Sequence, residues 1–312
     1  MTTTAAQKRT PTPTPASAGL VGWSRARRIQ GLAYAAPTAI YVAVFFILPL
    51  LLVLQMSASS WPLLGGNRGF NFPTNFSRLP TDRLFLPAVV FTIQYTVIVT
   101  VGLIGLGLGL ALLVQRSSRW VGFLRTSFLL PTAVGLASAS LLAWGFYSPQ
   151  IGPLNPILQT VGVIDQPISF IGTPTNALMS TVALIVWKFA GLYMLILLVG
   201  LQSIPGEVFE AAAIDGADRW QMFRRITLPL LRPSLALSLI LCVTGSLLAF
   251  DQFFILTKGG PDNSTVTIVQ LIYREAFQRQ NLGTAAAVSV ALLVALLILN
   301  IVQFRGLRRG EG

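Results

Sequence analysis

The sequence predicts an all-α polytopic membrane protein with about six transmembrane helices. Hydrophobic residues make up 54% of the 312 residues, charged residues make up only 10%, and the mean hydropathy is +0.71. An ordinary soluble domain carries about 25% charged residues, so a soluble core of this size could not bury so much apolar surface. A bilayer can hold this surface, because lipid solvates the outward-facing apolar side chains.

Six apolar runs are each longer than the ~20 residues that an α-helix needs to cross the ~30 Å hydrocarbon layer. The longer runs should tilt or extend past the lipid headgroups. The strands of a transmembrane barrel would be about 10 residues long and would alternate polar with apolar residues, so a barrel is excluded. The predicted spans lie at about 32–56, 87–114, 121–147, 177–202, 234–256 and 284–304.

The two ends of the chain are predicted to be tails. Residues 1–28 are rich in Thr, Pro, Ala and Ser, a composition that cannot bury a core and that is typical of disorder. The first apolar run is too long for the 7–15-residue hydrophobic region of a cleaved signal peptide, so this tail is not predicted to be removed. A transmembrane domain over 29–305 follows, and residues 306–312 form a short second tail.

The distribution of Lys and Arg predicts the orientation. With both termini in the cytoplasm, 14 of the 22 basic residues fall in cytoplasmic segments and six in outer loops, while Arg125 and Lys188 lie within spans. An excess of basic residues marks cytoplasmic loops. The sequence therefore predicts a multi-pass protein of the inner (cell) membrane, in contact with lipid and with cytoplasmic N- and C-termini. The net charge of +12 is explained without a nucleic-acid partner.

The chain lacks most of the side chains that enzymes use. It has no His and a single Cys, Cys242, which removes His-based proton transfer, most zinc and haem sites and any intrachain disulfide. It also lacks the Gly-x-x-x-x-Gly-Lys-Ser/Thr loop that cradles nucleotide phosphates. No catalytic residue, metal site or bound cofactor is predicted, and any use of ATP requires a separate chain.

One polar segment, residues 203–233, is too polar to span the membrane and too patterned for a simple linker. Ser203 can cap a helix, and Pro205 suits the first turn of that helix. Glu207 and Glu210 then lie near the positive end of the helix dipole, where acidic side chains are favourable.

The same segment continues into a second helix. Asp215 and Gly216 are expected to end the first helix, because glycine tolerates the positive φ of a helix stop. Trp220, Phe223 and Ile226 follow at intervals of three and should pack against the spans. The pattern predicts a helix–turn–helix whose small side chains allow a cytoplasmic partner to approach closely.

This segment resembles the EAA motif of the permeases of binding-protein-dependent ABC importers. The glycine lies six residues after the glutamate, and Ile-x-Leu-Pro begins ten residues after the glycine. The matching residues are Glu210-Ala211-Ala212, Asp215-Gly216-Ala217 and Ile226-Thr227-Leu228-Pro229. Later segments resemble the carbohydrate-uptake, maltose-type branch, with one departure at Lys258, where glycine is more usual. These segments are Phe250-Asp251, Leu256 to Pro261 and Tyr273 to Phe277.

The resemblance implies a type I importer permease with a coupling loop over 203–233 between the fourth and fifth spans. It implies three partners, namely a second permease subunit in a heterodimer, a cytoplasmic ABC ATPase dimer that binds ATP and Mg, and an extracytoplasmic substrate-binding protein. The coupling helix would dock in a groove of the ATPase. The implied coupling residues are Glu207, Glu210, Ala211, Ala212, Asp215, Gly216, Ala217, Phe223, Leu228 and Pro229.

Polar and aromatic residues within the spans are candidates for a solute path. Lys188 lies near the middle of the fourth span, where a charge costs ~2.5–3.5 kcal/mol. It either faces a watered cavity, snorkels, or pairs with a backbone carbonyl. Asp251, predicted in the outer third of the fifth span, either meets the solute or is a solvated helix end. The path candidates are Trp187, Lys188, Tyr193, Ser246, Asp251 and Gln252.

The sequence thus predicts half of the translocation path for a mono-, di- or oligosaccharide. A permease for another solute, such as glycerol phosphate or a polyamine, remains an alternative. A secondary transporter would show internal repeats, and an intramembrane enzyme would show a buried catalytic cluster; neither feature is evident.

Overall fold

The computed structural model describes residues 25–115 and 118–308. Within these ranges the protein is α-helical, and its only β-type pairings are isolated bridges such as that between Ser59 and Phe70. The predicted fold class is therefore confirmed. The disorder predicted for residues 1–24 lies outside the described residues. That prediction was wrong for residues 25–28, because a helix begins at Arg25.

The chain divides into two compact units, residues 1–52 and 53–312. The described part of the first unit is helical, formed by α1 (Arg25–Val42), the π-helical turn η1 (Ala43–Ile47) and the start of α2 (Leu48–Ser57), which continues across the boundary. The apolar stretch Tyr34–Ser57 is long enough to cross a membrane, and none of it is buried inside the chain. An unburied apolar helix of this length is typical of a span that faces lipid or another subunit.

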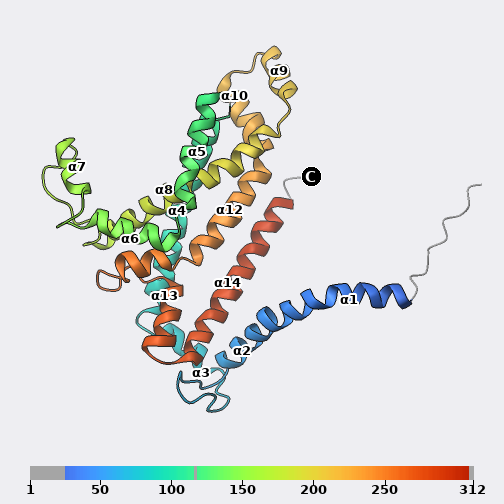
Figure 1. Cartoon of the computed structure of the whole chain (residues 1–312), viewed down its shortest axis with the longest axis vertical. Helices are drawn as coiled ribbons and strands as arrows, with labels where there is room; N and C mark the ends of the chain where they lie inside the picture. The colour runs from blue at the N-terminus through green and yellow to red at the C-terminus, as the bar shows by residue number, and fades with distance from the viewer. Residues whose placement is uncertain (1–24, 116–117, 309–312) are drawn as a thin grey trace, which may run out of the picture. The chain divides into compact units, whose positions relative to one another are not determined.

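Four helices form the core of the second unit: α4 (Phe85–Leu113), α8 (Pro174–Gln202), α12 (Arg232–Leu247) and α14 (Leu282–Arg308). α8 packs along α4, α4 also packs on α12, and α12 packs on α14 (Figure 1). Half of the most apolar part of α8 is buried, more than in α4 or α14. α8 is therefore the central element against which other helices of this unit are placed.

The third predicted span, 121–147, is not one continuous helix. It is split into α5 (Arg119–Ala133) and α6 (Leu136–Tyr147), which meet at 93°. Val134 and Gly135 have extended ψ angles of 134° and 142°, which interrupt the helical path just after Pro131. Hydropathy could not reveal this break, because both arms are apolar.

The fifth predicted span, 234–256, is also shorter than expected. α12 ends at Leu247, residues 249–250 are not helical, and a separate short helix follows that includes the π-helical turn η4 (Phe253–Thr257). Before α12, the chain bends by 64° after the short elements α10 (Arg219–Met222), η3 (Phe223–Thr227) and α11 (Leu228–Leu230). Counting each bent pair as one span gives up to six spans among the described residues.

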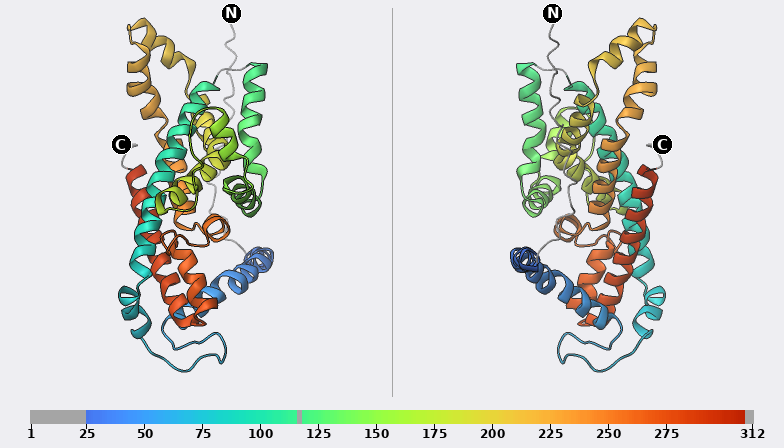
Figure 2. Two further views of the ribbon diagram at one scale, coloured as in Figure 1. Left: turned by 90° about the vertical axis from the view of Figure 1, so that its left-hand side faces the viewer. Right: turned by 90° about the vertical axis from the view of Figure 1, so that its right-hand side faces the viewer.

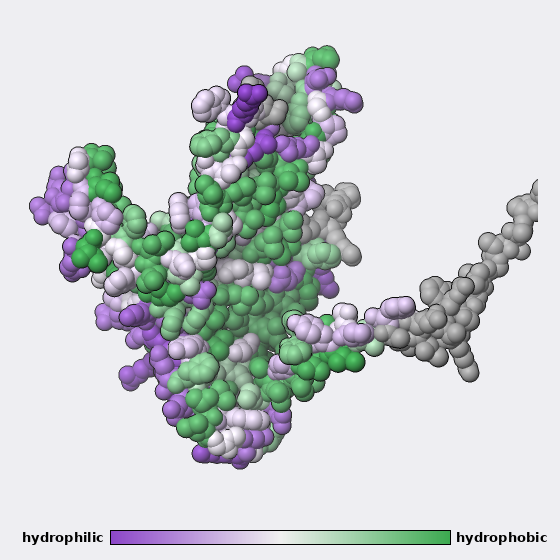
Figure 3. All heavy atoms as spheres, viewed as in Figure 1, coloured by the Kyte–Doolittle hydropathy of each residue, from purple (hydrophilic) through white to green (hydrophobic). Residues whose placement is uncertain are grey.

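The short helices lie at the two ends of the second unit. α9 (Gly206–Ile214) and α10 extend from one end, while α3 (Thr74–Arg78), η2 (Leu79–Thr81), α13 (Ile268–Tyr273) and η5 (Arg274–Gln278) lie at the other (Figure 2). A further short helix, α7 (Leu154–Thr160), follows α6. Hydrophobic side chains cover much of the visible face of α5, α12 and α14, and hydrophilic residues gather near α9–α10 and α7 (Figure 3). This pattern suits helices that cross lipid and carry polar ends.

Candidate functional site

The segment that joins α8 to α12 forms the predicted helix–turn–helix, but its first helix begins differently from the prediction. Ser203 does not cap α9. It is the last capping residue of α8, where its hydroxyl donates to the carbonyl of Gly200 at 2.7 Å. Pro205 precedes α9 as its N-cap residue, and Glu207 lies in the first turn. The serine is used at the end of α8 because the last carbonyls of a helix lack intrahelical donors.

The turn between α9 and α10 has the predicted glycine conformation. Gly216 has φ of +78°, and its N–H donates to the carbonyl of Ala213 at 3.1 Å. The N–H of Ala217 donates to the carbonyl of Ala212 at 2.9 Å, as in a glycine-terminated helix. No atom lies within 4 Å of a β-carbon built at Gly216, so the demand for glycine is purely conformational.

A capping box that sequence reasoning missed begins the second helix. The Asp218 carboxylate accepts from the N–H of Gln221 at 2.7 Å, and the Gln221 side chain accepts from the N–H of Asp218 at 3.2 Å. The signal was present in the sequence as an acidic residue followed three positions later by glutamine. The box fixes the direction in which the chain leaves the turn at Gly216.

The exposed face of this loop is partly apolar. Ile214 is 86% exposed and Trp220 is 66% exposed, so the prediction that Trp220 packs against the spans was wrong. The Trp220 ring instead lies 5.8 Å from the ring of Phe223. Single exposed apolar residues are ordinary, but two large ones flanking one turn are typical of a surface that a partner covers.

The predicted coupling residues divide by exposure. Those at the surface are Glu207, Glu210, Ala211, Asp215 and Gly216, whereas Ala212 is buried. The remaining four, half-buried, are Ala217, Phe223, Leu228 and Pro229.

The two ends of the loop lie close together, where α8 packs against α12. A β-carbon at Gly200, near the end of α8, would lie 2.1 Å from the hydroxyl oxygen of Ser234 in α12. Leu201 and Leu231 are buried in one apolar cluster beside this contact. α8 and α12 therefore touch where the loop leaves and returns.

Among the path candidates, Lys188 has the most definite environment. It is 3% exposed, and its ammonium donates to the carbonyls of Pro131 and Thr132, each at 3.4 Å, and to that of Val134. Its Nζ also lies 5.0 Å from the centre of the Phe189 ring. The geometry matches the alternative in which Lys188 pairs with backbone carbonyls.

The neighbours of Lys188 in α8 face other directions. Trp187 is 51% exposed, whereas Tyr193 is buried and lies against Gly107 of α4, where an added β-carbon would be 3.0 Å from the Tyr193 β-carbon. The structure therefore does not bring the three α8 candidates into one group.

The candidates near the end of α12 are separated by the break after Leu247. Asp251 is exposed and lies in the short helix after this break, not within α12 as predicted. Ser246 is buried in α12. Gln252 is buried, and its amide donates to the Tyr95 hydroxyl at 3.0 Å, while its side-chain oxygen has no hydrogen-bond partner.

Four aromatic rings that sequence reasoning did not combine form one group, which includes Phe250, the residue before Asp251. The ring centres are 5.0 Å apart for Phe250 and Phe254, 5.1 Å for Phe254 and Tyr273, and 5.2 Å for Tyr273 and Phe277. Phe254 and Phe277 are exposed. The i, i+4 spacing within each pair was the available signal, but only the fold brings the two pairs together.

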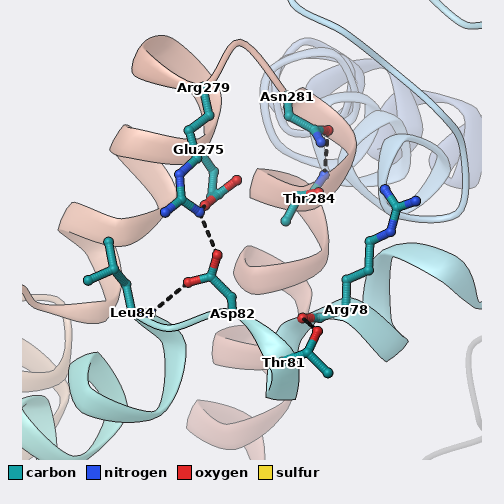
Figure 4. A network of polar contacts seen from close by, with 8 residues as sticks. All are labelled: Arg78, Thr81, Asp82, Leu84, Glu275, Arg279, Asn281 and Thr284. Atoms are coloured by element: carbon teal, nitrogen blue, oxygen red, sulfur yellow. Dashed lines mark hydrogen bonds and ion pairs between the residues drawn. The ribbon is translucent and has the colours of Figure 1, made fainter.

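At the α3 and α13 end, Arg279 joins two distant loops (Figure 4). It donates to the Asp82 carboxylate at 2.5 Å and to the Glu275 carboxylate, and Asp82 also accepts from the N–H of Leu84 at 2.7 Å. Partial burial alone would raise the pKa of Asp82, but the hydrogen bonds from Leu84 and Arg279 hold this pKa below its usual value. Burial raises the pKa of Glu275, against the opposing effect of Arg279.

Residues 25–115 and 118–308 contain no group of three or more Asp, Glu, Cys or His side chains that could hold a metal ion.

Comparisons with known proteins agree with this arrangement. Residues 103–305 match the family of binding-protein-dependent transport system inner membrane components. The multiple sugar-binding transport system permease protein MsmF of Streptococcus mutans is 33% identical over 84% of this chain and 89% of its own length. The sn-glycerol-3-phosphate transport system permease protein UgpA of Agrobacterium fabrum is 34% identical over 86% of this chain and 92% of its own.

A chain in the crystal structure of a bacterial alginate ABC transporter, in complex with an alginate pentasaccharide-bound periplasmic protein, has the same fold. It superposes with a TM-score of 0.80 at 24% identity, covering 92% of this chain and 97% of that one.

Fold and loop together define a permease subunit of an ABC importer. The chain belongs to the family of binding-protein-dependent transport system inner membrane components, as the resemblance to the EAA motif predicted. This membership decides against a secondary transporter and an intramembrane enzyme.

Neutralising each of the two carboxylates bound to Arg279 should change the stability of the fold in opposite directions. Because the pKa of Asp82 is lowered, its ionised form stabilises the fold, and this contribution is lost as pH falls through the folded pKa, below 3.8. Because the pKa of Glu275 is raised above 4.5, its ionisation opposes folding, and stability is lost as pH rises through the folded pKa. At neutral pH, Asp82→Asn should lower the melting temperature and Glu275→Gln should raise it or leave it unchanged.

Thermal unfolding of the purified protein in lipid nanodiscs, from about pH 3 to pH 8, would test this difference. The effect of Asp82→Asn should shrink at the acidic end, as should that of Glu275→Gln once Glu275 is protonated in the wild type. Asp165→Asn, at an exposed aspartate, is the matched control and should have no effect. Equal shifts of the same sign for both variants would contradict the assignment.

Proposed function

We propose that this chain forms one half of the translocation path of an ATP-driven importer for a sugar. A second permease subunit completes the path, a cytoplasmic ABC ATPase dimer binds ATP and Mg and hydrolyses the ATP, and an extracytoplasmic binding protein delivers the sugar. The observation that carries the proposal is the loop between α8 and α12, whose α9 helix and glycine turn present an exposed, partly apolar face.

The loop is suited to pass on motion from an ATPase. Ala211 is exposed beside Glu210, so another backbone can approach α9 closely. The Glu210 carboxylate would be desolvated on docking and would need a cationic partner on the ATPase. Since Gly200 and Ser234 hold α8 against α12, a push on the docked α9 displaces both spans at once.

A sugar is favoured over an anionic solute by the groups near the end of α12. Aromatic rings stack on the apolar face of a sugar ring, and the rings of Phe250, Phe254, Tyr273 and Phe277 lie together. Asp251, which follows Phe250 in the chain, is exposed. A carboxylate accepts hydrogen bonds from sugar hydroxyls but repels a phosphate. Lys188 is engaged by carbonyl oxygens, which argues against its serving an anionic solute.

Sequence relatives support a sugar without excluding glycerol phosphate. MsmF is described as part of a multiple sugar-binding system, and UgpA as part of an sn-glycerol-3-phosphate system. The aromatic rings and Asp251 therefore support a sugar, and glycerol phosphate is the second candidate because UgpA, at 34% identity, carries that description.

The proposed orientation places α9 and both termini in the cytoplasm and the α3–α13 end outside. The basic residues are the support for it, since 14 of 22 then lie in cytoplasmic segments. The Asp82–Arg279–Glu275 network would then lie on the outer side, where it fastens the loops that a binding protein meets.

Orientation can be tested with single cysteines introduced at Asp165 and Arg219 after Cys242, which is buried, has been replaced by alanine. A membrane-impermeant thiol reagent added to intact cells should label position 165 and not position 219, and both positions should react after the membrane is permeabilised. The reverse pattern would overturn the orientation and, with it, the coupling role of α9.

The proposed substrate predicts selective stimulation of the reconstituted complex. Proteoliposomes holding both permease subunits and the ATPase should hydrolyse ATP and accumulate solute when the cognate binding protein is loaded with a sugar. A panel of labelled mono- and oligosaccharides, glycerol 3-phosphate and a polyamine would identify the solute. Uptake of glycerol 3-phosphate but of no sugar would refute the sugar assignment and leave the importer assignment intact.

The coupling role predicts that Glu210→Ala and Gly216→Val reduce transport while the permease pair still inserts. Loss of one member of a desolvated charge pair costs about 2–5 kcal/mol, which would weaken docking of the ATPase. A β-branched residue at φ of +78° is strained, so valine at position 216 should misplace α9.

The measurements for these variants are ATPase stimulation by loaded binding protein and solute uptake. Gly206→Val is the matched control, because Gly206 also has open space around it but has no positive φ. Normal coupling in both Glu210→Ala and Gly216→Val would show that α9 is not the coupling element.

A further inference from the structure

The backbones of α5 and α8 are in direct contact around Lys188. A β-carbon at Gly191 would lie 2.0 Å from the carbonyl oxygen of Phe128 in α5, so only glycine allows this approach. Three residues before Gly191, the carbonyl of Lys188 accepts a hydrogen bond from the Thr132 hydroxyl at 2.9 Å. One turn of α8 therefore packs directly against the last turn of α5.

The side chain of Lys188 completes this contact at the helix break. Pro131 and Thr132 lie in the last turn of α5, and Val134 lies in the break itself. Their carbonyls all accept from the Lys188 ammonium. The N–H of Val134 also donates to the Pro131 carbonyl, at 3.3 Å. The last carbonyls of a helix carry the negative end of the helix dipole, so a buried cation there is bound favourably by several carbonyl oxygens at once.

The chain uses its other cation within a predicted span in the same manner. Arg125 of α5 donates to the carbonyl of Val114 at the end of α4, at 3.1 Å from Nε and 2.6 Å from Nη2. Both cations are therefore bound to helix C-termini. Because a charge within a span is costly, carbonyl oxygens at a helix end offset part of that cost.

The second arm of the bent pair is also bound to α8. The Tyr147 hydroxyl at the end of α6 donates to the carbonyl of Ser180 at 3.0 Å. The α5 arm is bound around Lys188 and the α6 arm at Ser180, so α8 holds the bent pair on both sides of its break.

We propose that Lys188 is the positioning residue that fastens the α5 arm to α8, so that displacement of α8 by the coupling loop is passed to the α5–α6 break. α8 ends at Gln202 and α9 begins at Gly206, so movement of α9 reaches α8 through only three residues. The inference rests on the proposed coupling function. Lys188 acts through the α5 carbonyls and does not contact the solute.

The test uses the complete complex with Lys188→Met, Lys188→Arg and Thr132→Val. Methionine keeps the length of the side chain and removes the charge, arginine keeps a cation, and valine removes only the bond from Thr132 to the Lys188 carbonyl. Lys258→Met is the matched control, because Lys258 is exposed between η4 and α13. The first measurement is the number of sugar molecules transported per ATP hydrolysed, which a purely structural role would leave unchanged in the complexes that assemble.

The second measurement is the distance between spin labels at Phe123 of α5 and Val199 of α8, both exposed positions, with and without ATP. In the wild type the distribution of distances between the two labels should be narrow, and it should be the same with and without ATP. Lys188→Met should broaden it and lower the sugar-to-ATP ratio at least about tenfold, because all the charge-assisted hydrogen bonds from the ammonium to the α5 carbonyls are lost and the loss of one such bond alone corresponds to about a tenfold effect. Lys188→Arg should restore most of the ratio, Thr132→Val should cause a smaller loss in the same direction, and Lys258→Met should change neither measurement.

A wild-type ratio and a narrow distribution in Lys188→Met would overturn the proposal, as would reduced yield with normal coupling in the complexes that assemble. If Lys188→Met does not assemble, an unchanged distribution and ratio in Thr132→Val would overturn it as well. A wild-type complex without ATP-driven sugar uptake would refute the proposed function, whereas the spin-label distances would still decide whether Lys188 holds α5 on α8.

Discussion

The structure depends on one constraint, that a backbone carbonyl in hydrocarbon needs a donor. Every helix ends with carbonyls that its own N–H groups do not reach, and a broken span places such an end inside the apolar layer. The chain meets this need with Lys188 at the break after α5, while Arg125 and Ser203 donate in the same way to carbonyls at the ends of α4 and α8, where those helices meet the loops that follow. The contact of Lys188 lies at the bend between α5 and α6, which is the largest departure from a simple helical bundle.

Hydropathy predicted the apolar segments of this fold and not their breaks, for a physical reason. A window average reports whether side chains suit lipid, and both arms of the 121–147 segment do. The break depends on the conformations of Val134 and Gly135, which are stable because Lys188 lies beneath the carbonyls exposed there. Lys188 and Pro131 are 57 residues apart in sequence, so no local pattern could pair them. The fifth span was overestimated in the same way, since the residues after Leu247 are apolar but leave the helix.

The loop between α8 and α12 was more predictable because its features are local. The positive φ of Gly216 follows from the need of a helix stop for a residue without a β-carbon, and the capping box of Asp218 and Gln221 could have been read from spacing alone. The prediction that Trp220 packs against the spans was wrong, because a spacing of three residues identifies one face of a helix but does not show what packs against that face. The aromatic rings beside Asp251 were missed for the opposite reason, since the pairs 250/254 and 273/277 become one group only when η4 and η5 come together in the fold.

The helices of the core make close contacts, whereas the loop between α8 and α12 exposes apolar side chains. This arrangement suits a protein that transmits motion. Gly191 lies against the backbone of Phe128, and Gly200 lies against the side chain of Ser234. At such close contacts one helix has little space to slide past the other without strain, so the helices tend to move together. At the loop, Ile214 and Trp220 lie open, and their apolar surface is stabilised only when another protein covers it. Force applied at the open loop therefore enters a set of helices already joined at fixed points, and α8, which is joined to α5, α6 and α12, is the helix that receives it first.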